Sequence, residues 1–513
     1  MKEPAGREST EHPLGVEGLK QAARERCEAI LAYCTAARGE ESFFQVEKAL
    51  MGLVRGFGVL CLQVFLAAYE DRLAYDRWLA SGLYRFKSTS LYRTIHTLFG
   101  EVRYGRHYLE KSGAGSGFFP LDAQLGLTRD GFSPWVMSLC AKLATRVSFG
   151  TAALLFRCFY GGSPCSATIQ ELVLGMGREA GGYVEQAPAP SEEGEVLIIE
   201  VDGKATPTAS QEELKQRRGP RQVKPSCPCG CQRHRGKIKR QSKKRKRRGK
   251  GRKDKNGRSI TLVVMYTLKQ GAEGKLHGPL NKKVWGSYAP RKKMLDWARE
   301  QATKRGFAPG TAQRIHIVVD GEKCLGNGLK ERFAQASFAL DIRHVEEKLW
   351  DMGRVLFKGE MDEVEAWVEE RKSQLYGGQV EALIAELKTL RDSLSKRAKR
   401  DQHKREELAS LIQYLEPRID MMNYQQLIEQ DLVIASGVVE GAARYVVGER
   451  MDCSGMRWIP GRAEALLHLR CIELNGQWEP FFEWAYERWR SKLKQAEKIR
   501  VQTDQPIDLP QAA

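Results

Sequence analysis

Two aspartates stand in the same short motif at distant points of the chain. VDG occurs at 201–203 and again at 319–321, each time directly after an apolar run. In open α/β sheets, ligands bind at the carboxyl ends of strands, and hard carboxylate oxygens suit Mg²⁺. Asp202 and Asp320 are therefore candidate metal ligands, although an Asp-Gly pair alone is also common turn chemistry.

A third acidic residue, Glu440, lies in the apolar segment SGVVEGAARYVVGER at 436–450. Gly437 and Gly441 are four residues apart, so a helix places them on one face, where they are predicted to allow close approach to a sheet. A glutamate beside that face is costly unless it binds a ligand or a partner. Arg444, at i+4, is the alternative partner.

The three carboxylates are predicted to converge on one site. Asp202, Asp320 and Glu440 are 118 and 120 residues apart in turn, and each interval contains an identifiable insertion. Carboxylates so grouped can hold two Mg²⁺ or Mn²⁺ ions about 3.5–4 Å apart, which activate water or a 3′-hydroxyl and stabilise the leaving oxygen.

A cluster of sulfur and imidazole ligands occurs in CPCGCQRH. The candidate Zn²⁺ ligands are Cys227, Cys229, Cys231 and His234. Three thiols and one imidazole suit tetrahedral zinc, but C-x-C-x-C is tighter than the usual C-x₂-C and needs a bend, which Pro228 and Gly230 would allow. The alternative is a set of unligated cysteines in a basic loop.

The excess positive charge is concentrated in one segment. The formal net charge is +19, and residues 215–255 hold 20 Lys or Arg against one acid, Asp254. Such a run indicates sequence-independent contact with nucleic-acid phosphates, with a solvated surface loop as the alternative. The residues predicted to bind DNA are Lys237, Lys239, Arg240, Lys243, Lys244, Arg245, Lys246, Arg247 and Arg248.

Composition argues against secretion and membrane insertion. The first 15 residues contain no apolar core of a signal peptide, and the longest apolar stretch, 56–69, is predicted to be a buried helix too short to span a bilayer. The 12 cysteines are scattered apart from one cluster, which favours a reducing cytoplasm over a disulfide framework.

The first part of the chain is predicted to be mainly helical. Helices are expected over 16–80, and a short β-hairpin over 91–110. Three periodic segments follow at 133–147, 148–159 and 166–180, with a Gly/Pro break before the third. This pattern is typical of a helix-turn-helix, and equally of a plain helical bundle.

A Pro/Ala/Glu linker at 185–195 precedes alternating strands and helices. The predicted strands are 195–203, 259–268, 314–322 and 337–345, and the predicted helices between them are 292–306 and 323–334. Amphipathic, highly charged helices over 346–430 form a predicted insertion, and a further helix begins near Ser436.

Several longer motifs resemble one family. They are VDGKATP at 201–207, RGPR and CQRHRGK in the basic loop, VVDGEK at 318–323, ALDIRHVEEKLW at 339–350, SGVVEGAARYVVGERMDCSGMRW at 436–458, LFGEVRYGRHYLE at 98–110 and FFPLDAQLGL at 118–127. The chain resembles bacterial insertion-sequence transposases of the DDE class, of the ISKra type, over most of residues 90–480.

The resemblance implies a ribonuclease H-like catalytic domain whose carboxylate triad is Asp202, Asp320 and Glu440. It also implies a small motif, Cys or Asp followed two residues later by His, which maps onto Asp341 and His344. A histidine there can bind a phosphate oxygen or stabilise a leaving group, with a capping or core histidine as the alternative. Family members often carry a paired-cysteine metal ribbon before the PLD motif, and residues 108–122 contain no cysteine.

We therefore expect an α/β ribonuclease H-like catalytic domain with a helical insertion, preceded by a mainly α-helical N-terminal region containing a helix-turn-helix-like segment. The expected divisions are 1–90 (helical), 91–190 (hairpin and helix-turn-helix-like, DNA-binding), 191–345 (first catalytic part, with the basic Cys/His loop at 210–257), 346–430 (insertion), 431–495 (catalytic completion and C-terminal helices) and 496–513 (polar tail).

The expected activity is metal-dependent cleavage and strand transfer at the ends of an insertion sequence. The partners would be double-stranded transposon ends and target DNA, bound by a homo-oligomer in the bacterial cytoplasm at the nucleoid. The alternatives are a catalytically silent domesticated transposase that binds DNA, and a structure-specific nuclease of the same fold.

Overall fold

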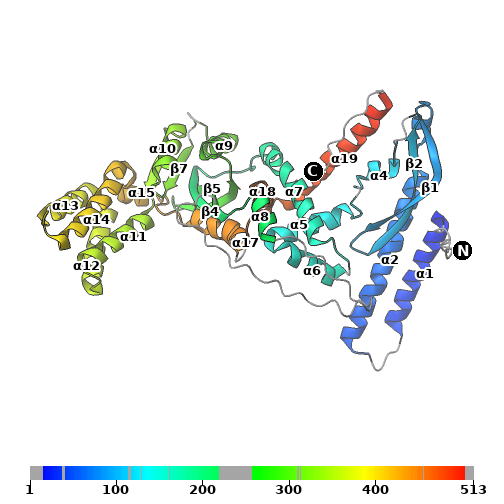
Figure 1. Cartoon of the computed structure of the whole chain (residues 1–513), viewed down its shortest axis with the longest axis horizontal. Coiled ribbons are helices and arrows are strands. Elements are labelled where there is room, and N and C mark those ends of the chain that lie inside the picture. Colours follow the sequence, from blue (N-terminus) through cyan, green and yellow to red (C-terminus); the bar gives the residue numbers. More distant parts are fainter. Residues whose placement is uncertain are drawn as a thin grey trace. The chain divides into compact units, whose positions relative to one another are not determined.

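The computed structural model describes residues 15–36, 41–113, 117–128, 130–160, 162–218, 257–308, 311, 313–453 and 456–502 (Figure 1). The chain divides into two compact units. The first is built from Met1–Glu179 with Gln477–Ala513, and the second from Ala180–Gly476. The predicted zinc ligands and the predicted DNA-binding lysines and arginines fall within 219–256, outside the described residues.

The first unit begins with two helices, as predicted, α1 (Val16–Thr35) and α2 (Phe43–Asp71). The prediction of a short, buried helix at 56–69 is wrong. The helix has 29 residues, because the helical pattern continues upstream of Gly56, and between 56 and 69 only Gly58 and Leu66 are buried. By length and composition α2 is long and apolar enough to cross a membrane, which for a single helix is weak evidence of a membrane protein.

The predicted hairpin is confirmed and is longer than expected. Strands β1 (Tyr84–His96) and β2 (Glu101–Lys111) pair in antiparallel fashion, and the short β3 (Gly117–Phe118) adds to β2. Leu66 of α2 shares a buried cluster with Ile95 and Val102 of the hairpin. The expected boundary at residue 90 is therefore wrong, because it cuts through β1 and through this shared core.

Three helices follow where three were predicted: α5 (Pro134–Arg146), α6 (Phe149–Tyr160) and α7 (Ser166–Gln186). Their assignment as a helix-turn-helix stays a prediction. The last helix, α19 (Trp478–Gln502), belongs to this unit, where the Trp478 indole donates to Ser138 Oγ over 3.0 Å. The expected division 431–495, which joined the catalytic completion to the C-terminal helices, is therefore split at residue 476.

The second unit contains a five-stranded mixed sheet in the order β6-β5-β4-β7-β8. Its strands are β4 (Val196–Pro207), β5 (Gly257–Gln270), β6 (Leu276–Ser287), β7 (Arg314–Val319) and β8 (Ser337–Leu340). The central strand β4 runs parallel to β7 and antiparallel to β5, and β7 runs parallel to β8. The first six residues of β4 are all buried, as its continuous apolar run predicts.

Three differences from the predicted elements have local causes. Strand β6, at the edge of the sheet, is not among the predicted strands. Only its last four residues are buried, so its sequence shows no alternating pattern. The strand predicted at 337–345 ends at Leu340, because Asp341 caps a helix. The loop predicted from 210 starts with α8 (Gln211–Arg218), whose first turn is capped by the Ser210 hydroxyl.

Helices flank the sheet and form the insertion. As predicted, α9 (Arg291–Lys304) and α10 (Lys323–Arg332) alternate with strands. The insertion contains α11 (Ile342–Leu356), α12 (Met361–Tyr376), α13 (Val380–Ser393), α14 (Lys399–Leu415), a 3₁₀ turn (Glu416–Met421) and α15 (Tyr424–Glu429), and Figure 1 shows α11 to α14 gathered into a bundle. The chain then returns to the sheet through α16 (Gly437–Ala442), a π-helical turn (Ala443–Gly448), α17 (Glu449–Met451) and α18 (Pro460–Leu474).

Candidate active site

Strand register brings three aspartates to one end of the sheet. The last parallel pair between β4 and β7 is Glu200 with Val318, so Asp202 and Asp320 lie at the same level, two residues further on. Val319 pairs with Leu340, so Asp341 is level with Asp320. Neighbouring strands are about 4.8 Å apart, which places the three residues side by side. The Asp-Gly motif predicts that Asp202 ends its strand, and this prediction is wrong, because β4 continues to Pro207.

The Asp202 carboxyl group is influenced by the other two members of the predicted triad. Burial raises its pKa, the Gly203 amide partly offsets this over 2.5 Å, and the charges of Asp320 and Glu440 raise it further. Asp202 therefore lies near enough to Asp320 and to Glu440 for each of their charges to disfavour its ionised form. A divalent cation bound among them would relieve this repulsion.

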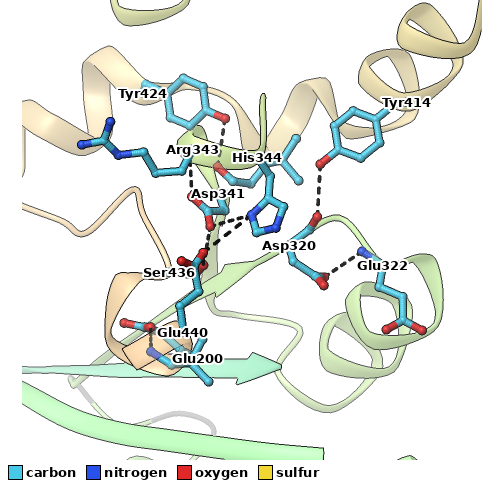
Figure 2. A network of polar contacts seen from close by, with 12 residues as sticks. Glu200, Asp320, Glu322, Asp341, Arg343, His344, Tyr414, Tyr424, Ser436 and Glu440 are labelled. Carbon is cyan, nitrogen blue, oxygen red and sulfur yellow. Dashed lines mark hydrogen bonds and ion pairs between the residues drawn. The ribbon is translucent and has the colours of Figure 1, made fainter. Parts of the chain in front are cut away.

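The turn that carries Asp320 is held by the insertion. Gly321 has φ +85°, and a Cβ there would lie 2.5 Å from the Tyr414 hydroxyl oxygen, so this position requires glycine. The Tyr414 hydroxyl donates to the Asp320 carbonyl over 3.1 Å, and the Arg418 guanidinium donates to the Gly321 carbonyl over 2.6 Å. The Glu322 amide donates to Asp320 Oδ1 over 2.8 Å, and this bond orients the carboxylate (Figure 2).

Glu440 stands at the start of α16 with its side chain half exposed. Its Oε1 accepts from the Ser436 hydroxyl over 3.1 Å and lies 3.9 Å from His344 Nδ1. No contact with Arg444 is found among the described residues, so the alternative of a Glu440–Arg444 pair is not supported. The prediction that Gly437 and Gly441 permit close packing is wrong, because a Cβ at either position would meet open space.

The helix bearing Glu440 meets the sheet through Val439 and Ala442, which are buried. Its continuation is a π-helical turn, in which the usual carbonyl partners are displaced. The buried Arg470 of α18 donates to the carbonyl oxygen of Val446, within this turn, over 2.8 Å. This contact stabilises the turn that continues the helix of Glu440.

Asp341 and His344, the two residues of the small motif that the resemblance implied, form a hydrogen-bonded pair. Asp341 is fully buried, and its two oxygens accept from the Arg343 amide, the Ser436 hydroxyl and the His344 imidazole, whose Nδ1 is 2.9 Å away (Figure 2). Burial lowers the pKa of His344, but Asp341 outweighs it, so the net shift is upward. The pair favours the tautomer with hydrogen on Nδ1 and leaves Nε2 directed away from the pair.

Two sets of side chains are candidate metal ligands. The ligand atoms of Asp341, His344 and Glu440 lie within 4.8 Å of one another, a closeness that no other three such side chains reach in the described part of the chain. The oxygens of Asp341, however, are already engaged by three partners. By contrast, no described residue bonds Oδ2 of Asp202 or Asp320, so the all-carboxylate set retains oxygens for a hard cation.

Sequence reasoning missed four residues that support the site. Tyr414 and Arg418 lie in the insertion, where no local pattern marks them as partners of a turn almost 100 residues away. Ser436 was assigned only as a helix start. Glu200 left a readable signal, since it is the one charged residue inside the apolar run VLIIEV, and it is fully buried.

Comparisons with known proteins leave the family open. No family model matches the chain. A stretch of 115 residues is 37% identical to the "UPF0236 protein in vanSb 3'region" of Streptococcus gallolyticus, covering 22% of this chain and 25% of that protein. The chain thus matches about a quarter of that relative's length. The relative's name states no activity, so the resemblance to ISKra-type transposases stays a prediction.

The Tyr414 clamp gives a testable expectation for the Asp320 turn. In Tyr414→Phe the ring keeps its packing while the hydrogen bond to the Asp320 carbonyl is removed. We expect a loss of about 1 kcal/mol in unfolding free energy and a fall of about tenfold in metal-dependent DNA cleavage. Denaturant titration measures the change in unfolding free energy, and single-turnover cleavage of a labelled duplex measures the change in rate.

Tyr486→Phe is the matched control, since that hydroxyl also donates to a backbone carbonyl, at Leu125 in the first unit. It should cost similar stability and leave cleavage unchanged. Equal cleavage by Tyr414→Phe and the parent would show that the clamp does not position Asp320.

Proposed function

We propose that the chain is a DDE transposase that cleaves DNA strands at the ends of an insertion sequence and joins them to target DNA. The observation that carries the proposal is that strand register sets Asp202 and Asp320 at the same level of β4 and β7, while the charges of Asp320 and Glu440 both raise the pKa of Asp202. The strand order, with the antiparallel pairings β6–β5 and β5–β4 beside the three parallel strands β4, β7 and β8, supports a ribonuclease H-like assignment for this unit.

The carboxylates fit a divalent-metal site. Asp202 and Asp320 each commit one oxygen to a backbone amide and retain the other, and Glu440 is half exposed beside them. When bound there, Mg²⁺ or Mn²⁺, as two ions, would activate the attacking oxygen and stabilise the leaving one. The chain's own contribution is to hold these oxygens at fixed places.

His344 has a separate role in the proposal. Its ring is oriented by the buried Asp341 carboxylate, and Nε2 can give a proton to, or accept one from, a DNA oxygen. Protonation is favoured by the raised pKa of the imidazole. His344 would thus assist departure of the 3′-oxygen.

In this proposal the basic segment binds the partner, double-stranded DNA. Its lysines and arginines, from Lys237 to Lys255, would contact phosphates of double-stranded DNA without reading sequence. The Cys227, Cys229, Cys231 and His234 cluster beside it would hold Zn²⁺. Action as a homo-oligomer on DNA, in the bacterial cytoplasm at the nucleoid, belongs to the same proposal.

The experiment uses the full chain with a labelled duplex carrying the sequences that flank its gene, in Mg²⁺ and in Mn²⁺. We expect nicked products with 3′-hydroxyl ends and joined products when target DNA is added, together with inverted repeats beside the gene. Cleavage without joining would favour a structure-specific nuclease. Binding without cleavage in either metal would favour a silent DNA-binding protein and overturn the proposal.

A further inference from the structure

A buried carboxylate lies directly beneath the candidate site and has no part in the proposed chemistry. Glu200 is fully buried in β4, two residues before Asp202, so strand alternation directs both side chains to the same face of the sheet. Taking a carboxylate out of water is costly unless hydrogen bonds compensate it. Burial raises the pKa of Glu200, and the charges of Asp341 and Glu440 add to the rise.

Two donors compensate Glu200. Its Oε2 accepts from the Val439 amide over 2.8 Å, and its Oε1 accepts from the Tyr266 hydroxyl, also over 2.8 Å. Val439 directly precedes Glu440 in the first turn of α16. One carboxylate thus joins the strand that carries Asp202 to the helix turn that carries Glu440.

The way α16 begins explains why this bond is needed. First-turn amides of a helix have no partner within the helix and are usually capped by the N-cap side chain. Ser436 occupies the N-cap position, but its side chain accepts no hydrogen bond from the first turn and its hydroxyl faces the carboxylates of Asp341 and Glu440. The Glu200 carboxylate, which belongs to the sheet, accepts from the Val439 amide in place of the Ser436 side chain.

We propose that Glu200 is a positioning residue that sets the place of Glu440 relative to Asp202. It touches neither DNA nor metal, since it is fully buried, and acts only through the Val439 amide. The inference rests on the proposed function in one respect, that Asp202 and Glu440 serve a common divalent-cation site. It predicts that loosening Glu200 weakens the cation site without weakening DNA binding.

The test compares Mn²⁺ binding to the full-length parent and to Glu200→Gln, measured by calorimetry or by the loss of free Mn²⁺ signal in electron paramagnetic resonance. The amide keeps the shape of the side chain, but its single oxygen can serve only one of the two donors. We expect the Mn²⁺ dissociation constant to rise about 10–100-fold, as for other residues that orient metal ligands. The Mg²⁺ concentration for half-maximal cleavage should rise in parallel, with unchanged DNA affinity.

Glu464→Gln is the matched control. Glu464 is also a largely buried carboxylate in the same unit, and it accepts from the Tyr288 amide over 2.8 Å and from the Ser287 hydroxyl. It should lose comparable stability with no change in Mn²⁺ affinity. Tyr266→Phe is a second, milder variant that removes the other donor, and it should raise the Mn²⁺ dissociation constant by a smaller factor even if Glu200→Gln fails to fold.

Three results would overturn the inference: no Mn²⁺ binding by the parent, unchanged Mn²⁺ affinity in Glu200→Gln, or an equal loss of affinity in Glu464→Gln. If Glu200→Gln does not fold, unchanged affinity in Tyr266→Phe would overturn it as well. Failure of the proposed function looks different. The parent would bind Mn²⁺ and Glu200→Gln would bind it more weakly, yet neither protein would cleave DNA.

Discussion

In Asp320→Asn, metal-dependent DNA cleavage should fall by more than about a hundredfold while DNA binding survives. Changing a residue that only orients a metal ligand lowers metal affinity or activity about 10–100-fold, so changing a proposed direct ligand should lower activity further. Asparagine retains an oxygen that can accept from the Glu322 amide, so the turn keeps its shape while the charge is removed. Cleavage is measured on a labelled end-containing duplex in Mg²⁺, and binding is measured by fluorescence anisotropy at one fixed salt concentration.

Asp296→Asn is the control, since Asp296 accepts from Arg332 Nε over 2.7 Å in the same unit and is assigned no role in catalysis. It should cleave at the parent rate. Any residual cleavage by Asp320→Asn should need Mn²⁺, which tolerates a poorer ligand set. An unaltered rate in Mg²⁺ would defeat the triad assignment even for a protein that cuts DNA.

Deletion of residues 237–255 should weaken binding to every duplex by about the same factor. The segment contains 13 Lys or Arg and one Asp. A protein that neutralises 6–10 phosphates becomes about 10³–10⁵ weaker in affinity between 50 and 200 mM salt. Without the segment, the slope of log K against log salt should shrink by about 0.9 for each phosphate that the protein no longer neutralises.

A second variant separates charge from length. Replacing the lysines and arginines of 237–255 by glutamine keeps the chain length and should reproduce the deletion. The unfolding transition of the remaining protein should be unchanged in both variants, because the segment offers no apolar side chain besides Ile238 to a core. An unchanged salt slope, or a loss of folded protein, would refute the assignment of the segment to phosphate binding.

Local patterns predict most elements of this chain because each depends on neighbours in sequence. The apolar runs that became β4, β5 and β7 and the periodic segments of the insertion depend on burial of one face or both. β6 escaped prediction because an edge strand with only four buried residues carries little pattern. The exposure of most of α2 was not predicted either, since an apolar composition does not show whether another surface covers the helix.

In the candidate site, too, local sequence patterns identify some residues and miss others. Residue type and motif singled out Asp202, Asp320, Glu440 and His344, and the structure brings all four to one region. The residues that hold them act across long sequence separations, as Tyr414 does on the Asp320 turn. Such interactions follow from strand register and helix placement, which no single segment encodes.

The long separation between β4 and α16 affects the order in which the site becomes complete during synthesis. Glu440 leaves the ribosome 238 residues after Asp202, which at about 5–20 residues per second is a delay of roughly 10–50 s. Throughout that interval the buried Glu200 has no Val439 amide to accept from, and Asp202 has no Glu440 beside it. Under the proposed function, a nascent or prematurely ended chain can already hold DNA through its basic segment but cannot cut it.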